Sequence, residues 1–515
     1  MKAKKSSAAA VGRRLAYRAA MLPAVLMLGL VLPFLFVRTA FLVLESAALC
    51  SSSIGCVRWR LFGGSDAALV REELTRALLE AASINEDDDG SRIGIEKVKG
   101  GSNRGPISFK DLVRDFTSNR HDIKTFAITT KAMIDNMERL VQRAKWHESM
   151  YWHLAAHGVP SRLHCLSLKL AEEYAVNAVA RSPLPLPQHV YRLSDPFLNH
   201  IVLLTDNVLA ASVVVSSAVK TSSNPERLVF HVVTDKKSYT SMHSWFSVNK
   251  IPSAVVEIKG LQQYDWPHEV NVAVKDMLEI HQQIRNHHHR RMIEEDFEFM
   301  KEHDHYRTDV LSQSCVSLLN HLRIYLPELF PDLDKVVFLD DDVVVQRDLS
   351  SLWDLDLNEK VVGAVFDPCC KYEDYFNFSN PIISSNLDQH RCGWLYGMNI
   401  FDLKQWRKSN ITATYQEWLK LNLNSGYTLW RSGALPPALI AFEKLVHHLD
   451  PSWHVAGLGQ RYPNVEKDKL EGGAVIHFSG PAKPWLETGS PEVSSLWYRH
   501  VNLSNEYIAR CGITG

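Results

Sequence analysis

The chain has 515 residues, enough for two or three domains, and 46% of them are hydrophobic, which supports a sizeable core. Its 57 Lys and Arg residues nearly balance its 58 Asp and Glu residues, so the formal net charge is −1. This balance excludes a global electrostatic attraction to nucleic acid or to an anionic surface, and any contact with a polyanion has to be local.

The N-terminus joins a basic segment to a long apolar one. Residues 1–18 contain six Lys and Arg residues and no acid, and Ala19 to Val37 contains no charged residue. We predict a cytoplasmic tail at 1–18 and a transmembrane signal anchor at 19–44, because this length matches the ~20 residues that cross a bilayer and basic flanks stay cytoplasmic. The alternative is a cleavable signal peptide, whose apolar region usually has only ~7 to 15 residues.

Everything after an anchor would be lumenal, and three sequons agree with that placement. We predict glycosylation at Asn377, Asn410 and Asn502, each of which begins an acceptor triplet. Some of the eight cysteines should form disulfides in such a compartment. Cys50 and Cys56 are expected either to crosslink subunits or to close a small loop.

Two segments precede the predicted main domain. We predict a stem at 45–106, and at 107–188 a helical arm followed by a Pro-rich linker. Apolar residues recur at three-, four- and seven-residue spacing from Leu112 to Val141, which indicates a helical hairpin or a coiled-coil-like arm. This arm serves either as a spacer or in oligomerisation. A further amphipathic helix, Leu163 to Arg181, is ended by SPLPLP at Ser182 to Pro187.

The region 189–515 alternates short apolar runs with helical patterns. This rhythm predicts a largely parallel, Rossmann-like α/β sheet flanked by helices. The expected strands are His200 to Thr205, Leu228 to Thr234 and Ala254 to Gly260, and the expected helices are Val208 to Lys220, Ser238 to Asn249 and Leu318 to Leu329. We interpret the cluster His287 to His289 as part of a solvated insertion rather than a metal site.

One predicted strand ends in three carboxylates, within KVVFLDDDVVVQ at Lys335 to Gln346. An apolar strand cannot carry such charge into a core, so it should surface at its carboxyl end, where open α/β sheets bind ligands. We predict that Asp340 and Asp342 bind a divalent cation. Asp341 should point the other way, because side chains alternate along an extended segment. Kinases and phosphatases also place carboxylates after a strand, so the pair alone does not define an enzyme class.

A second segment, HFSGPAKPW at His477 to Trp485, narrows the choice. His477 can ligate a metal, Gly480 allows a close backbone approach to a ligand, and Lys483 offers a positive charge to phosphate. Two carboxylates and an imidazole leave room at the cation for two phosphate oxygens, so the cation can neutralise a diphosphate leaving group. These residues predict a nucleotide-sugar transferase that uses Mn²⁺ or Mg²⁺ rather than zinc.

Together with four further motifs, these two segments resemble plant galacturonosyltransferases of glycosyltransferase family 8. The further motifs are NHLRIYLPELFP at Asn320 to Pro331, WLYGMNIFDLKQWR at Trp394 to Arg407, LPPALIAF at Leu435 to Phe442 and WHVAGLG at Trp453 to Gly459. The resemblance is dense from His200 to Arg499. It implies a GT-A catalytic domain at 189–515 and a retaining transfer, normally of galacturonate from UDP-galacturonate to pectic homogalacturonan in the Golgi.

The resemblance also implies roles for individual residues. The matching positions are Asp340, Asp342 and His477 for the metal, expected to be Mn²⁺; Gly480 and Lys483 for the diphosphate; Asp206 and Asn207 for the nucleoside; and Arg323 for the donor sugar. We expect the two metal-binding aspartates and the arginine to form the catalytic group.

The chain departs from bacterial relatives at several donor positions. Thr205 and Val208 stand where their nucleoside loop has an acid and an aromatic residue, and Leu395 to Gly397 and Leu435 to Pro437 replace two segments near the reacting sugar. No residue is therefore nominated to face the anomeric carbon. Asp367 either contacts the sugar or caps a turn.

We expect a single-pass type II Golgi membrane protein that adds galacturonate to a pectic glycan, alone or as a homo- or hetero-oligomer with related transferases. One alternative is transfer of another UDP-sugar in the synthesis of xylan or a related wall glycan, and another is a non-catalytic scaffold subunit. A uronate donor carries a carboxylate, so a basic side chain, Arg323 or one near Trp394 to Asn399, is expected to distinguish galacturonate from galactose.

Overall fold

The computed structural model describes residues 158–514, apart from 284–317, 431–432, 461–462 and a few single positions, together with parts of 131–151. The predictions of a tail, an anchor and a stem lie outside the described residues, as do Cys50, Cys56 and the interpretation of His287 to His289. Within the described ranges, no helix is both long and apolar enough to cross a membrane.

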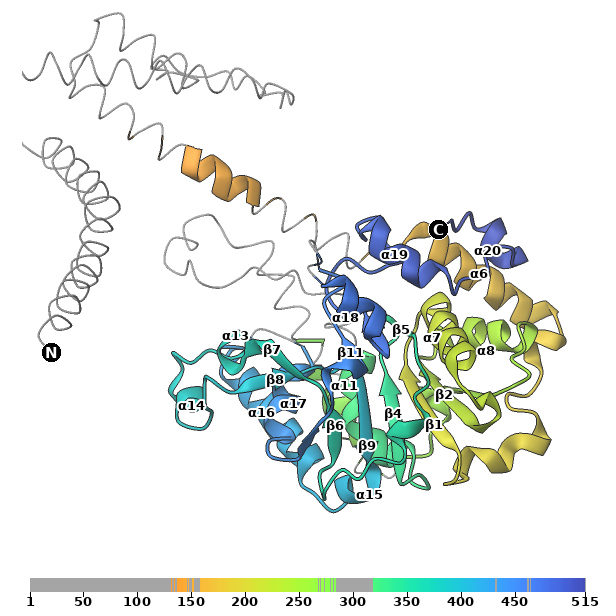
Figure 1. The fold of residues 1–515 in the computed structure, drawn as a ribbon, viewed down its shortest axis with the longest axis horizontal. Helices are drawn as coiled ribbons and strands as arrows, with labels where there is room; N and C mark the ends of the chain where they lie inside the picture. The colour runs from red at the N-terminus through yellow and green to blue at the C-terminus, as the bar shows by residue number, and fades with distance from the viewer. Residues whose placement is uncertain are drawn as a thin grey trace, which may run out of the picture. The chain divides into compact units, whose positions relative to one another are not determined.

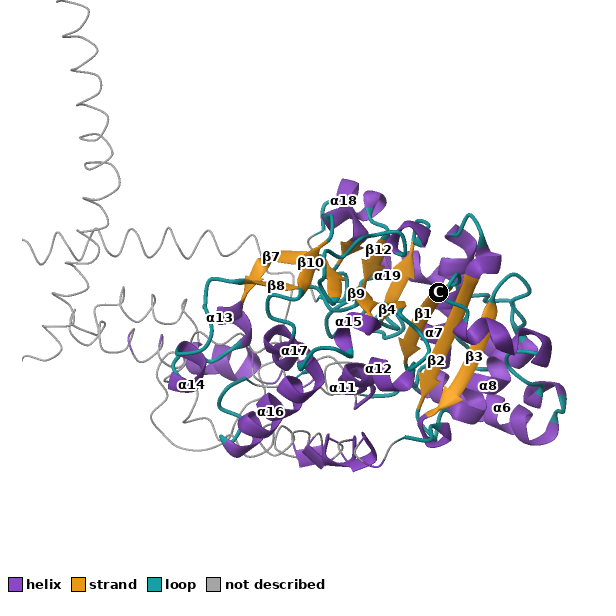
Figure 2. Cartoon of the chain, turned by 90° about the horizontal axis from the view of Figure 1, so that it is seen from below, coloured by secondary structure: helices purple, strands orange, loops and turns teal. Residues whose placement is uncertain are grey.

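The central sheet has seven strands in the order β10-β6-β9-β4-β1-β2-β3 (Figure 1 and Figure 2). Its strands are β1 (Asn199–Leu204), β2 (Leu228–Thr234), β3 (Val255–Gly260), β4 (Lys335–Leu339), β6 (Val362–Ala364), β9 (Met398–Asp402) and β10 (Val446–His448). The first four are parallel, which confirms the predicted βα rhythm. The sheet as a whole is mixed, because β9 is antiparallel to both β4 and β6.

Alternate side chains of each central strand enter two separate cores. Ile201 and Leu203 of β1 pack into one core and Val202 and Leu204 into the other, as period-two alternation requires. The first core includes residues of α6 (Ser161–Val176), α7 (Val208–Thr221) and α8 (Tyr239–Val248). The second includes residues of α11 (Leu318–Leu322), α12 (Leu326–Leu329), α15 (Leu403–Trp406), α16 (Ile411–Asn424) and α17 (Leu435–Ala441), which group together in Figure 2. Burial on both faces explains why these strands are continuous apolar runs.

The helix expected at Leu318 to Leu329 is interrupted in the structure. α11 and α12 are separated by a 3₁₀ turn, Arg323–Tyr325. Pro327 has no backbone N–H to donate to the carbonyl of Arg323, so a regular α-helix cannot pass through this point. The expectation of one continuous helix was therefore wrong, and the break lies at a residue predicted to contact the donor.

Two small sheets accompany the central one. One contains β11 (His454–Val455), β12 (Val475–His477) and β5 (Val343–Val345), and the other pairs β7 (Phe366–Lys371) with β8 (Cys392–Trp394). Further α-helices with fully described bounds are α13 (Tyr372–Tyr375), α14 (Pro381–Ser384), α18 (Lys467–Gly472), α19 (Pro491–Tyr498) and α20 (Glu506–Arg510). β4 belongs to the central sheet and the next strand, β5, belongs to the three-stranded sheet. The three aspartates between them therefore lie where the chain passes from one sheet to the other.

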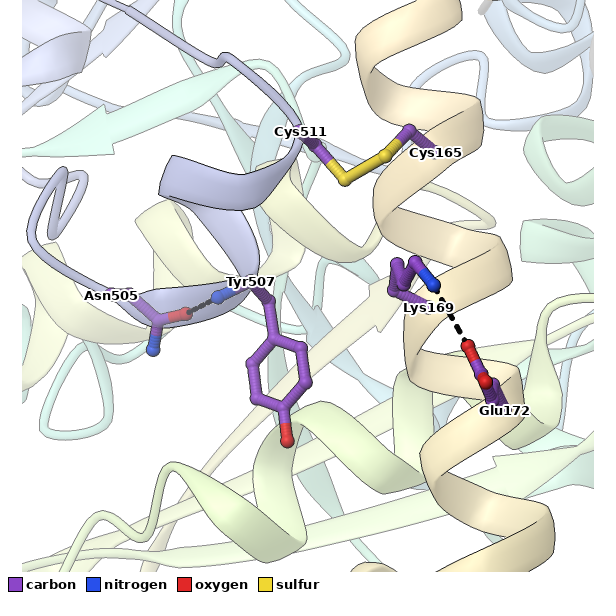
Figure 3. Close-up of a disulfide and its surroundings, with 6 residues drawn as sticks. All are labelled: Cys165, Lys169, Glu172, Asn505, Tyr507 and Cys511. Carbon is purple, nitrogen blue, oxygen red and sulfur yellow. Dashed lines mark hydrogen bonds and ion pairs between the residues drawn. A yellow bond between two sulfur atoms is a disulfide. The ribbon is translucent and has the colours of Figure 1, made fainter.

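A disulfide joins the beginning of the described domain to its end. Cys165 in α6 is bonded to Cys511, which follows α20 (Figure 3). Cys370 and Cys392 have free thiols. The α6 helix also packs against α8, although it precedes the predicted domain boundary at 189.

Four apolar residues of the predicted arm are helical and exposed. They are Ile134, Met137, Leu140 and Val141, in the unit that comprises Met1–Trp146. This observation agrees with a helical arm, whose role as a spacer or in oligomerisation stays a prediction.

Candidate active site

Backbone pairing brings the two predicted metal-binding segments together. Asp340 follows β4 and its N–H donates to Gly397 O at 2.8 Å, while Phe478 N donates to Asp342 O at 2.9 Å. β12 runs antiparallel to β5, with His477 opposite Val343. These bonds place His477 beside the aspartates, although the two segments are far apart in the sequence.

Asp342 lies at the centre of a buried charge cluster. Its Oδ1 is 3.0 Å from His477 Nε2, and its Oδ2 accepts a hydrogen bond from Lys483 Nζ. Burial alone would raise the pKa of Asp342, but His477 and Lys483 outweigh that effect and hold the pKa below its ordinary value. Lys483 also donates to Phe478 O at 3.3 Å, so its ammonium group is fixed at the cluster.

Asp340 completes a group of three side chains that fits a divalent cation. Oxygen atoms of Asp340 and Asp342 and a ring nitrogen of His477 all lie within 4.8 Å of one another. Asp342 Oδ1 is buried, and among the described residues it has no hydrogen-bond partner beyond its close contact with His477 Nε2. Burial and the charge of Asp342 raise the pKa of Asp340, and Arg323 opposes this shift. A cation at this position would offset the repulsion between the two carboxylates and use the orphaned oxygen.

The imidazole of His477 is held by two neighbours that the sequence did not single out. A Cβ atom at Gly397 would lie 2.2 Å from Cε1 of the ring, so only glycine leaves room for it. On the other side, His477 Nδ1 is 3.0 Å from Nε2 of the buried His454. Burial and the neighbouring His477 lower the pKa of His454 well below its ordinary value. His454 lies in the WHVAGLG motif, which had served only to support the family resemblance.

Arg323 is fully buried and supports Asp340. Its guanidinium group donates to Asp340 Oδ1, to the carbonyl of Tyr396 and to Asn320 Oδ1. The same group lies 3.7 Å from the ring centroid of Phe338 and 3.8 Å from that of Tyr396. These hydrogen bonds and ring contacts fix both the position of the Arg323 guanidinium group and the orientation of the Asp340 carboxylate.

Asp341 points to a different neighbour, as alternation predicts. Its Oδ2 accepts a hydrogen bond from Thr205 Oγ1 at 2.6 Å, and Thr205 Oγ1 in turn accepts from Asn207 N at 3.0 Å. Burial and the charge of Asp342 raise the pKa of Asp341 to about 7, although the Thr205 bond opposes the shift. The third carboxylate is therefore linked to the predicted nucleoside loop.

The predicted nucleoside residues differ in their surroundings. Asp206 has solvent contact but many protein atoms surround its carboxyl group, so desolvation, followed by the charge of Asp235, raises its pKa. Asn207 caps helix α7, since its Oδ1 accepts from Ala210 N at 3.1 Å. This cap is a structural role that the resemblance did not imply.

Gly480 has a structural reason to be glycine. Its φ is +124°, and a Cβ atom would lie 2.3 Å from Gly459 O. Gly459 N donates to Ser479 O at 3.1 Å, and Ala482 N donates to Gly459 O at 2.8 Å. The close approach to the loop that follows β11 requires glycine at this position, and the expected approach to a ligand stays a prediction.

Two further sets of predicted residues are not members of the metal-binding group. Asn410 and Asn502 are exposed, whereas Asn377 is half-buried and donates to Thr428 O at 2.9 Å. Asp367 lies in β7, and burial followed by the charge of Asp367 raises the pKa of the Cys370 thiol to about 12. The roles predicted for these residues stay predictions.

A mixed α/β sheet with a carboxylate and imidazole cluster after its central strand has the architecture of a GT-A-like glycosyltransferase. The sequence profile described as glycosyl transferase family 8 matches residues 165–489. Two Arabidopsis thaliana proteins, probable galacturonosyltransferases 13 and 14, are each 46% identical over 97% of this chain and 94% of their own length. The chain therefore belongs to glycosyltransferase family 8, among its plant galacturonosyltransferase-type members.

Similar solved structures are more distant in sequence. A galactosyltransferase LgtC complex with donor and acceptor sugar analogs has a TM-score of 0.38 at 18% identity, over 61% of this chain and 99% of that one. The bifunctional glycosyltransferase WbbM has a TM-score of 0.41 at 17% identity, over 62% and 51% of the two chains.

Proposed function

We propose that this chain is a retaining, metal-dependent galacturonosyltransferase that transfers galacturonate from UDP-galacturonate to a homogalacturonan-type acceptor in pectin synthesis. The observation that carries the proposal is the convergence of Asp340, Asp342 and His477 beside the buried Lys483. The choice of sugar is supported by relatives named galacturonosyltransferases, which include a third Arabidopsis thaliana protein at 42% identity over 81% of this chain.

The cluster fits a diphosphate leaving group. Asp340, Asp342 and His477 would hold a divalent cation, with Mn²⁺ the best match for oxygen and imidazole donors. When bound, this ion supplies Lewis-acid stabilisation of the departing diphosphate. Lys483 adds a fixed positive charge at the same place, because Asp342 and the Phe478 carbonyl anchor its ammonium group. The leaving phosphate itself can accept the proton of the attacking hydroxyl group.

Arg323 contributes by positioning. Its buried guanidinium group is committed to Asp340, Asn320 and the Tyr396 carbonyl, and it is stacked between two rings. These contacts favour orientation of a metal ligand over direct recognition of the galacturonate carboxylate. Arg323 therefore supports catalysis by orienting Asp340. We expect a different basic side chain to bind the galacturonate carboxylate.

The predicted nucleoside loop is held by the segment that carries the metal-binding aspartates. Thr205 bridges Asn207 to Asp341, so the third aspartate fixes the loop that carries Asp206. We propose that Asp206 and Asn207 contact the nucleoside and that Gly480 and Lys483 line the diphosphate site.

We further propose a type II Golgi membrane protein with a lumenal catalytic domain. The supporting features are the basic and apolar N-terminal segment and the sequons at Asn377, Asn410 and Asn502. The same setting accommodates assembly with related transferases through the predicted arm.

Donor selection tests this function directly. The purified chain should transfer labelled galacturonate from UDP-galacturonate to a short oligogalacturonide, and EDTA should abolish the transfer until Mn²⁺ is restored. UDP-galactose and UDP-xylose serve as matched donors. Transfer from one of these neutral donors alone would reject the galacturonate assignment, and transfer that resists EDTA would reject the metal site.

A further inference from the structure

The hydrogen bond between His454 and His477 has a direction that follows if His477 Nε2 ligates the proposed cation. His477 Nε2 faces the carboxylates, 3.0 Å from Asp342 Oδ1 and 3.9 Å from Asp340 Oδ2. His477 Nδ1 faces His454 Nε2 at 3.0 Å. A nitrogen that ligates a cation must present a lone pair, so the ring proton of His477 has to be on Nδ1. His454 Nε2 is then the acceptor of that proton.

The fold holds His454 in this position independently of the aspartates. β11 pairs in parallel with β12, with His454 opposite Val475 and Val455 opposite Ile476. The His454 side chain is buried, and the two imidazole rings are inclined by 22° with centroids 5.1 Å apart, so they meet edge to edge through their nitrogens. Strand pairing and burial therefore fix both the distance and the orientation of the two rings.

We propose that His454 is a positioning residue for the metal site, which selects the Nδ1–H tautomer of His477 and aims its Nε2 lone pair at the cation. This inference rests on the proposed metal-binding function of Asp340, Asp342 and His477. Outer partners of metal-binding histidines are usually carboxylates or carbonyls, and their removal weakens metal binding by about 10- to 100-fold. A neutral imidazole performs the same task here without adding negative charge to a cluster that already contains two carboxylates.

Direct metal titration of the full-length chain tests the proposal. Mn²⁺ binding is followed by the loss of the free-ion EPR signal, without donor or acceptor. His454→Leu removes the acceptor and should weaken Mn²⁺ binding by about 10-fold or more. His454→Gln keeps an oxygen that can accept from His477 Nδ1, and it should restore most of the affinity. The matched control is His243→Leu, because His243 is also buried but bonds to the backbone of Ala180.

The outcomes separate this inference from the metal site itself. Failure of the unmodified chain to bind Mn²⁺ would overturn the metal site and the inference with it. Tight binding by the unmodified chain and equally tight binding by His454→Leu would overturn the inference alone. Equal weakening in His454→Leu and His454→Gln would also overturn it, because a purely steric role predicts no rescue by an acceptor.

A spectroscopic measurement on the unmodified chain does not depend on whether a variant folds. Long-range ¹H–¹⁵N spectra of the histidine side chains distinguish the two neutral tautomers. With Mg²⁺ bound as the diamagnetic ion, His477 should carry its proton on Nδ1. A His477 ring protonated at Nε2 would overturn the proposal.

Discussion

Two buried histidine pairs in this protein have nearly the same geometry and different surroundings. His454 and His477 approach to 3.0 Å between ring nitrogens with ring centroids 5.1 Å apart, and His200 and His231 approach to 3.0 Å with centroids 5.3 Å apart. In each pair the rings are inclined by 22°. Geometry between the rings therefore does not distinguish a candidate functional pair from a structural one.

The difference lies at the ends of the two networks. His231 Nδ1 bonds to Glu257 Oε2 and His200 Nε2 bonds to Asp195 O, each at 2.7 Å, so every ring nitrogen of that pair has a partner. Neither end of the other network is closed: Asp342 Oδ1 has no partner beyond His477 Nε2, and His454 Nδ1 has no hydrogen-bond partner among the described residues. A closed network satisfies buried polar groups and stabilises a fold, whereas an open one leaves an acceptor for a ligand.

The largest expected effect is on kcat, which should fall after a substitution in the open network and not after one in the closed network. Asp342→Asn keeps the side-chain shape but removes the charge that faces His477 and Lys483. We expect kcat to fall by about 10²- to 10³-fold, as for the loss of other preorganised charge stabilisation. Glu257→Gln in the closed network is the matched variant and should leave kcat unchanged. Equal losses in the two variants would show that Asp342 acts only through folding.

The closed pair should instead affect stability in acid. Burial and the neighbouring His231 lower the pKa of His200 to about 4. Because the unfolded chain binds a proton at His200 more readily than the folded chain, protonation favours unfolding. The contribution of neutral His200 to the free energy of unfolding is complete above the ordinary pKa of about 6.5 and is lost as the pH falls through about 4. We expect the free energy of unfolding to decrease by up to about 3 kcal/mol over this window. Urea denaturation at several pH values measures it, and His200→Gln should flatten the profile; an unchanged slope would reject this origin.

Gly397 offers a steric test of the open pair. Its hydrogen atoms face the His477 ring, so Gly397→Ala should displace the imidazole and weaken Mn²⁺ binding on the order of 10-fold. Gly472→Ala is the control, because a Cβ atom at that position meets nothing within 4 Å. Mn²⁺ titration of both variants measures the effect. Unchanged affinity in Gly397→Ala would mean that the ring position is not important for binding.

The smallest expected effect concerns a residue with two assigned roles. Asn207→Ala removes the cap of α7 and should cost about 1 kcal/mol of stability, as measured by denaturation. Asn207→Ser can still cap the helix, so it should preserve stability. A raised KM for UDP-galacturonate in both variants would confirm a nucleoside contact, and an unchanged KM in both would leave Asn207 as a cap alone.

Local patterns predicted the central strands well but not the partners across sheets. The boundaries of β2, Leu228–Thr234, were predicted from an apolar run, because burial on both faces leaves a continuous signal. The grouping of Asp340 and Asp342 with His477 was predicted from residue chemistry and the family resemblance. The bond between Asp341 and Thr205 and that between His454 and His477 depend on strand order, which residue spacing does not reveal.

The remaining misses have similar causes. The disulfide of Cys165 with Cys511 spans a sequence separation of 346 and carries no local signal. The break at Arg323 could have been found, since Pro327 forbids the regular bond four residues back. The close contact of Gly397 with His477 could be found only from the folded backbone, because a glycine after an aromatic residue occurs in many structural contexts.

The bond between Cys165 and Cys511 also turns the chain from α6 to the end of α20 into a covalent ring. One proteolytic cut inside that ring leaves the two pieces attached to each other. The aspartates and His477 all lie within this ring, so a single cut between them does not release either segment from the other.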